Sequence, residues 1–106
     1  MKITIQESNS QTNPSKVIVL LEGRLDTIAS QEHAEEWEQV LSYAAQPIVL
    51  NMQQLEYVAS SGLRMLFTLR REVTDKGGEL VLQGVTPNVM QILKMSGCKD
   101  LFNYAE

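Results

Sequence analysis

Residues 48–67, IVLNMQQLEYVASSGLRMLF, contain the change of pattern that decides the fold. Residues 48–52 form a short continuous apolar run, which is typical of a central strand. Residues 60–78, SSGLRMLFTLRREVTDKGG, then follow a helical period and end at two glycines. A strand that leads directly into an amphipathic helix indicates a sheet whose strands alternate with helices.

The chain ahead of this stretch predicts two strands and one helix. Ile3 and Ile5 alternate with polar residues in the first strand, and a polar turn or hairpin loop follows at 8–15. The second strand, residues 17–21, is rich in β-branched side chains, so we expect it to be buried on both faces and to end at Gly23. A single helix is expected over residues 24–46, with Asp26 or Thr27 as its cap.

The chain after the stretch predicts a strand at 79–85, a helix at 86–97 and a short last strand at 101–104. Thr86 is placed as the helix cap, Pro87 in the first turn and Gly97 as the stop. Strands that alternate with helices pair in parallel through right-handed crossovers, while the first two strands can form an antiparallel hairpin. The prediction is a single α/β domain, residues 1–106, with a mixed central sheet of about four to five strands.

Composition excludes several classes of function. The 106 residues carry a net charge of −4, so they provide no general basic field for nucleic acid. No apolar run approaches membrane-spanning length, and MKITIQES at the start lacks the apolar core of a secretion signal. The single cysteine cannot form an internal disulfide. These features predict a cytoplasmic protein that neither binds nucleic acid nor inserts into a membrane.

Ordinary catalytic constellations are missing from the sequence. His33, the only histidine, is expected to be solvated on a Glu-rich helix, and Cys98 is expected to be a packed thiol. Trp37 falls at helical spacing and is expected in the core. No phosphate-binding loop or metal-binding loop pattern occurs, so the sequence predicts neither enzyme activity, cofactor nor metal.

The stretch ASSGLR, residues 59–64, permits two compatible interpretations. Ser60 or Ser61 can cap the following helix, with Gly62 relaxing the steric demand of its first turn. A hydroxyl at this strand-to-helix junction also lies at the carboxyl edge of the sheet, where a phosphate would meet the positive end of the helix dipole. One serine can therefore cap while the other is presented to a partner.

Several stretches together resemble a STAS domain of the anti-sigma factor antagonist family over essentially the whole chain. These are LEGRLDTIAS, IVLNMQQLEYVASSGLRMLF, GGELVLQGV and VMQILKMSGCKDLFNYA. The two serines, glycine and leucine between the apolar strand and the helix are the most specific element. The resemblance implies a mixed sheet with helices mainly on one side.

The resemblance also implies a partner switch without catalysis by the chain itself. An unphosphorylated antagonist binds an anti-sigma factor that is also a serine kinase, which frees sigma factor. The kinase then phosphorylates the antagonist with ATP and weakens the complex, and a serine phosphatase resets it. The family pattern Asp-Ser-Ser-Gly-Leu aligns its acceptor with Ser60, with Ser61 as the less favoured position, and aligns its acidic residue with Ala59.

Partner contacts carried over from the resemblance surround this acceptor. They are Asp26, Thr27, Ser60, Ser61, Gly62 and Arg64. An alternative is a docking or regulatory subunit of a membrane lipid-transport ATPase or of a stress-sensing assembly, in which Ser60 needs no phosphate. Nucleotide binding by the domain ranks below both, because the chain has no phosphate loop.

Overall fold

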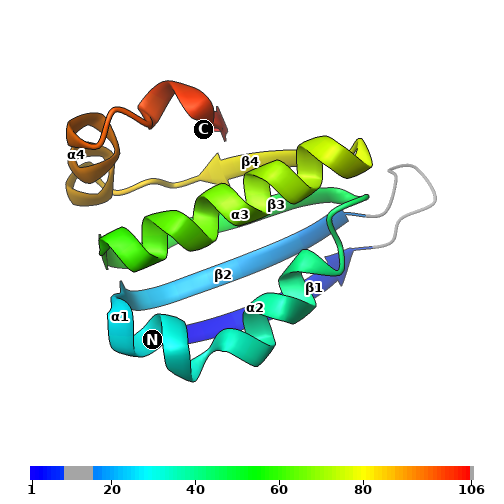
Figure 1. Ribbon diagram of the computed structural model, residues 1–106, viewed down its shortest axis with the longest axis horizontal. Coiled ribbons are helices and arrows are strands. Elements are labelled where there is room, and N and C mark those ends of the chain that lie inside the picture. The colour runs from blue at the N-terminus through cyan, green and yellow to red at the C-terminus, as the bar shows by residue number, and fades with distance from the viewer. Residues whose placement is uncertain (9–15, 106) are drawn as a thin grey trace.

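The computed structural model describes residues 1–8 and 16–105, which form one five-stranded sheet with helices packed against it (Figure 1). The strands are β1 (Lys2–Ser8), β2 (Lys16–Leu25), β3 (Pro47–Val58), β4 (Glu79–Gln83) and β5 (Asn103–Ala105). The helices are α1 (Thr27–Glu32), α2 (Ala34–Leu41), α3 (Ser60–Lys76) and α4 (Pro87–Met95), followed by the 3₁₀ turn η1 (Lys99–Leu101).

The order of strands in space follows their order in the chain, from β1 to β5. β1 is antiparallel to β2, and every later pair is parallel. Because parallel crossovers are right-handed, a strand order that advances in one direction brings successive connecting helices to the same face. The α/β fold with a mixed sheet and helices on one side is thus confirmed.

The core lies between the sheet and these helices. On the covered face, Val17, Val19 and Leu21 of β2 have no exposed surface, and they join one buried cluster with Trp37 and Leu66 of the helices. The opposite face of β2 is only half-buried, so the expectation that residues 17–21 would be buried on both faces is wrong. A strand whose second face carries no helix needs no complete burial there.

Both central strands are longer than their apolar runs. β2 continues through Gly23, whose φ of +101° accompanies a shift of pairing register, and reaches Leu25. β3 continues past residue 52 and pairs with β2 as far as Leu25 opposite Val58. Gly23 therefore does not end its strand, because glycine accepts the backbone angle that this irregular pairing requires.

The predicted single helix over residues 24–46 is two helices that meet at His33. This residue has φ −107° and ψ 22°, outside the helical region, and its Nδ1 lies 2.5 Å from Oε1 of Glu36. His33 is half-buried at this junction, so the expectation of a solvated histidine within a helix is wrong. The break lets α1 and α2 follow the sheet at different angles (Figure 1).

The helix ends agree with the sequence more closely than the strand ends do. Gly77 ends α3 in the left-handed conformation with φ +73°, and Pro87 opens α4 after the cap Thr86, whose hydroxyl accepts from the Val89 N–H at 3.4 Å. These positions confirm the predicted stop of α3 and the predicted cap of α4, while α4 itself ends at Met95, before the predicted stop Gly97. Of the predicted polar turn at 8–15, Ser8 ends β1 and residues 9–15 lie outside the described chain.

Candidate functional site

The candidate site forms where β2 and β3 end side by side. Leu25 and Val58 are paired at the last register position of these parallel strands. One residue further on, the Ala59 N–H donates to the Leu25 carbonyl at 2.9 Å. The segments that the sequence suggested for the site, residues 22–27 and 59–64, therefore leave the sheet at the same edge, as expected for carboxyl ends of parallel strands.

Asp26 holds the start of α1. Its extended backbone (φ −100°, ψ −175°) precedes the helix, and its Oδ1 accepts a hydrogen bond from the Ala29 N–H at 2.9 Å. This confirms Asp26 as the cap, in preference to Thr27, which is the first helical residue. A cap of this kind contributes about 1 kcal/mol. The half-buried carboxylate thus has a structural role whatever else it contacts.

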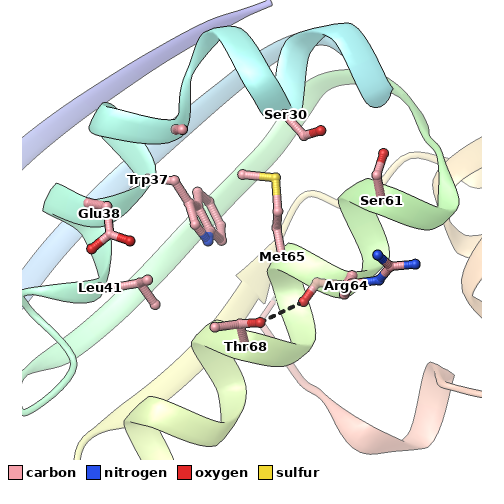
Figure 2. Close-up of a pocket in the computed structure, with 9 residues that line it drawn as sticks. Ser30, Trp37, Glu38, Leu41, Ser61, Arg64, Met65 and Thr68 are labelled. Carbon is pink, nitrogen blue, oxygen red and sulfur yellow. Dashed lines mark hydrogen bonds between the residues drawn. The ribbon is translucent and has the colours of Figure 1, made fainter.

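Thr27 and Ser61 join the first turns of α1 and α3. The Ser61 hydroxyl donates to Thr27 Oγ1 at 3.3 Å. Thr27 is exposed and Ser61 is half-buried, so the pair lies at the surface between the two helices. Figure 2 shows Ser61 on α3 opposite Ser30 on α1. The structure brings Asp26, Thr27 and Ser61 together, although 34 positions separate Thr27 and Ser61 in the chain.

Neither serine caps α3, so the prediction that Ser60 or Ser61 does so is wrong. The residue in the cap position is Ala59, with φ −82° and ψ 173°, and no side chain caps this helix. Ser60 is already the first helical residue, and its side chain is exposed. The first N–H groups of α3 are consequently left to solvent or to a ligand, as at any helix without a side-chain cap.

Gly62 lies buried under the first turn of α3. A Cβ built on this residue would lie 2.7 Å from both Cγ and O of Leu25, and 2.9 Å from Cγ1 of Val58. The absence of a side chain therefore lets α3 approach the ends of β2 and β3 closely. This is a packing role, rather than the relaxation of the helix's own first turn that the sequence suggested.

Arg64 projects from the exposed side of α3, one turn after Ser60. Within residues 1–8 and 16–105 it forms no ion pair. Figure 2 shows its guanidinium extending from α3 below Ser61. Arg64 therefore adds an exposed cation to the edge that carries the hydroxyls of Thr27, Ser60 and Ser61.

Two further residues at this edge were missed by sequence reasoning. Ile28, next to Thr27, is 66% exposed, while the neighbouring Ala29 is buried. Helical periodicity around a buried Ala29 could have indicated that Ile28 faces outward. Arg24 stacks over Tyr57 with 4.5 Å between the guanidinium carbon and the ring centre. The pairing of Arg24 with Tyr57 across β2 and β3 could not be found without the register of the two strands.

The remaining chemically reactive side chains lie elsewhere. Cys98 is buried and its thiol contacts the Leu93 carbonyl, and burial raises the pKa of that thiol. Trp37 is a core residue, as expected. The part of the chain that the structure describes holds no group of three His, Cys, Asp or Glu side chains able to bind a metal. None of its helices has the length and hydrophobicity to cross a bilayer.

Known proteins share both this fold and this sequence pattern. The chain is 25% identical over 99% of its length to a protein of Bordetella bronchiseptica named as an anti-sigma factor antagonist, BtrV, and covers 86% of that protein. It is 32% identical over 76% of its length to the anti-sigma F factor antagonist of Paenibacillus polymyxa, and covers 70% of it.

Solved structures agree at the level of the fold. The unphosphorylated anti-sigma factor antagonist SpoIIAA superposes with a TM-score of 0.71 at 20% identity, over 97% of this chain and 89% of that one. The sequence profile of the STAS domain matches residues 7–106. The chain therefore belongs to the STAS domain family and, within it, to the anti-sigma factor antagonists.

Proposed function

We propose that this chain is a non-catalytic, phosphorylation-controlled antagonist of an anti-sigma factor that is also a serine kinase. The unphosphorylated chain binds the kinase and frees sigma factor. Phosphorylation of Ser60 weakens the complex, and a serine phosphatase restores it. The observation that carries the proposal is the exposed Ser60 at the first position of α3, beside the exposed start of α1.

The surroundings of Ser60 support a switch that acts through charge. A phosphate adds about 1.5–2 negative charges at neutral pH. At the first turn of an uncapped helix, that charge meets free N–H groups and the positive end of the helix dipole. The domain can then tolerate phosphorylation while its partner meets a changed surface. Thr27, Asp26 and Arg64 lie around the same edge and are proposed to contact the kinase.

The two serines differ in a way that an experiment can use. Ser60 is exposed, while Ser61 is half-buried and donates to Thr27. The kinase recovered on the immobilised chain would be incubated with the chain and Mg-ATP, and mass spectrometry would locate the phosphate. We expect phosphate on Ser60 and its loss in Ser60→Ala. Phosphate on Ser61 alone would show that Ser61 is the acceptor and would leave the proposed switch in place. Phosphate on neither serine would refute the switch.

Binding measurements test the electrostatic mechanism separately. Ser60→Asp should weaken the complex about tenfold or more, because it places a negative charge where the partner docks. Ser60→Ala should stay bound in the presence of ATP. Ser42→Asp is the matched control, since Ser42 is exposed at the far end of α2. Equal affinities of the Ser60→Asp and Ser42→Asp variants would contradict the mechanism.

Ala59 favours a second candidate function. It occupies the position where the family pattern has an acidic residue, so a kinase could fail to recognise the site. The chain would then be a docking subunit of a lipid-transport ATPase or of a stress-sensing assembly. Recovery of a transporter ATPase on the immobilised chain, with no phosphate on either serine, would favour this candidate.

A further inference from the structure

A groove of about 350 Å³ lies between the helical pair α1–α2 and helix α3. Its apolar part is formed by Trp37, Leu41 and Met65, and its polar part on α3 by Ser61, Arg64 and Thr68. Figure 2 shows Trp37 and Leu41 on α2 facing Met65 on α3, while the Arg64 side chain extends outward from α3. Small-molecule sites are usually concavities of this size with apolar walls and a few polar groups.

Trp37 provides the groove with a hydrogen-bond donor that has no acceptor. The side chain is 5% exposed, and its Nε1 has no hydrogen-bond partner among the described residues. An indole N–H can only donate, and a buried donor without a partner is unfavourable. Figure 2 shows the indole reaching from α2 toward α3. A ligand that offers an oxygen acceptor at this point would satisfy the donor.

One basic and one acidic side chain, Arg64 and Glu38, line the groove. Arg64 is exposed and, within the described chain, unpaired, so its guanidinium is available to a carboxylate. The one acidic side chain that lines the groove, Glu38, projects from α2 on the other side of Trp37 in Figure 2. A carboxylate near Arg64 would therefore be separated from Glu38 by the indole.

Met65 lies beside the indole on the α3 side of the groove. Trp37 Nε1 has essentially no exposed surface, and the half-buried Met65 side chain points toward the indole in Figure 2. Methionine is unbranched and changes rotamer readily, so it can move aside for a ligand and then pack against it. Binding is thus expected to reorganise this one side chain, with the backbone of α2 and α3 in place.

We propose that this groove binds a small organic carboxylate with a compact apolar body. The apolar body packs between Trp37, Leu41 and Met65. The carboxylate accepts a hydrogen bond from the Trp37 N–H, and the exposed Arg64 side chain turns from its position in Figure 2 to pair with it. The groove includes Ser61 and Arg64, which lie near Ser60 on α3, but not Ser60 itself. Its occupancy requires neither a kinase nor phosphate, so the proposal does not depend on the function proposed above.

Trp37 is the only tryptophan of the chain, so its fluorescence reports directly on the groove. The purified full chain would be titrated with 4-phenylbutyrate and, as the neutral match, with 4-phenylbutan-1-ol, up to about 10 mM. We expect a saturable change with the carboxylate and binding about tenfold weaker with the alcohol. In a ¹⁵N-resolved NMR spectrum, the indole N–H resonance should shift as its new hydrogen bond forms.

Two substitutions on α3 test whether the Arg64 side chain itself binds the carboxylate. Arg64→Gln should weaken 4-phenylbutyrate binding about tenfold. Arg71→Gln removes an exposed cation of the same helix that does not line the groove, and should bind as the unmodified chain does. Circular dichroism would establish that both variants are folded. Trp37→Phe, measured by calorimetry, should weaken binding while keeping an aromatic wall.

Three results would overturn the proposal. The first is the absence of a saturable signal up to the highest concentration. The second is equal binding of the acid and the alcohol, which would describe an apolar crevice without anion selectivity. The third is an equal effect of Arg64→Gln and Arg71→Gln, which would show that Arg64 acts only through the net charge of the chain and does not contact the ligand. No kinase is present in these assays, so their failure would leave the proposed phosphorylation untouched.

Discussion

At the scale of single residues, the start of α3 is unusual because its cap is an alanine. Asp26 and Ala59 occupy equivalent positions before α1 and α3, with extended backbones in both cases. Only Asp26 supplies an acceptor, to the N–H three residues ahead. The equivalent donor at α3 is the N–H of Gly62. The helix at the proposed switch thus lacks the interaction that secures its neighbour.

Ala59→Asp should therefore stabilise the protein. The introduced carboxylate is placed to accept from the first N–H groups of α3 and to interact favourably with the helix dipole, and caps of this type contribute about 0.5–2 kcal/mol. Urea unfolding followed by circular dichroism would measure the gain. Ala59→Asn caps without a charge, so a gain in both variants assigns the effect to the cap. An unchanged midpoint in both would show that position 59 does not cap.

Residue roles could be predicted where the local pattern alone decides them. Thr86 and Gly77 were identified, and Asp26 was one of two candidates for its cap, because a cap or a left-handed stop has a clear residue preference. The prediction that Ser60 or Ser61 caps α3 was wrong, because the cap is the residue that keeps an extended backbone immediately before the helix. That boundary is set by the pairing of β3 with β2, which continues to Val58. A shift of one residue moved the serines into the helix.

At the scale of elements, the site depends on how closely α3 approaches the ends of β2 and β3. The lengths of these strands could not be predicted, since Gln53, Gln54 and Glu56 interrupt the apolar pattern while the backbone continues to pair. The order of strands and helices could be predicted, apart from the break of the first helix at His33, because the period of the apolar residues differs between strands and helices. The contact between Ser61 and Thr27 could not be predicted from the sequence, because it depends on how α1 and α3 lie in space.

Gly62→Ala should destabilise the contact between α3 and the sheet. A Cβ at this position would lie 2.7 Å from the Leu25 carbonyl oxygen, which is backbone and cannot rotate away. The helix must shift, at a cost of about 1–3 kcal/mol. Ser61→Ala, in the same turn but half-exposed, is the control and should change the free energy of unfolding by no more than about 0.5 kcal/mol. Equal effects of the two substitutions would contradict this packing role.

At the scale of the whole molecule, the fold raises the pKa of one thiol and two tyrosine hydroxyls, those of Cys98, Tyr104 and Tyr43. Burial raises the pKa of the Cys98 thiol and is also the main cause of the raised pKa of Tyr104. A hydrogen bond with the Glu7 side chain is the main cause of the raised pKa of Tyr43. Cys98 and Tyr104 follow α4, while Tyr43 follows α2, so the effect is distributed over the molecule.

These shifts predict that stability declines in alkaline solution. A group whose pKa is higher in the folded than in the unfolded chain contributes stability below the unfolded pKa, and that contribution is lost as pH rises. For Cys98 the loss should begin near pH 8.5, the ordinary value of a free thiol, and the tyrosines should add to it above about pH 10. Urea unfolding of the unmodified chain between about pH 7 and 9.5 should show a falling free energy of unfolding, and Cys98→Ala should flatten that fall. The substitution also removes a packed sulfur atom, which lowers stability by a similar amount at every pH. A constant difference between the two proteins across the range would therefore show that the thiol does not titrate differently on folding.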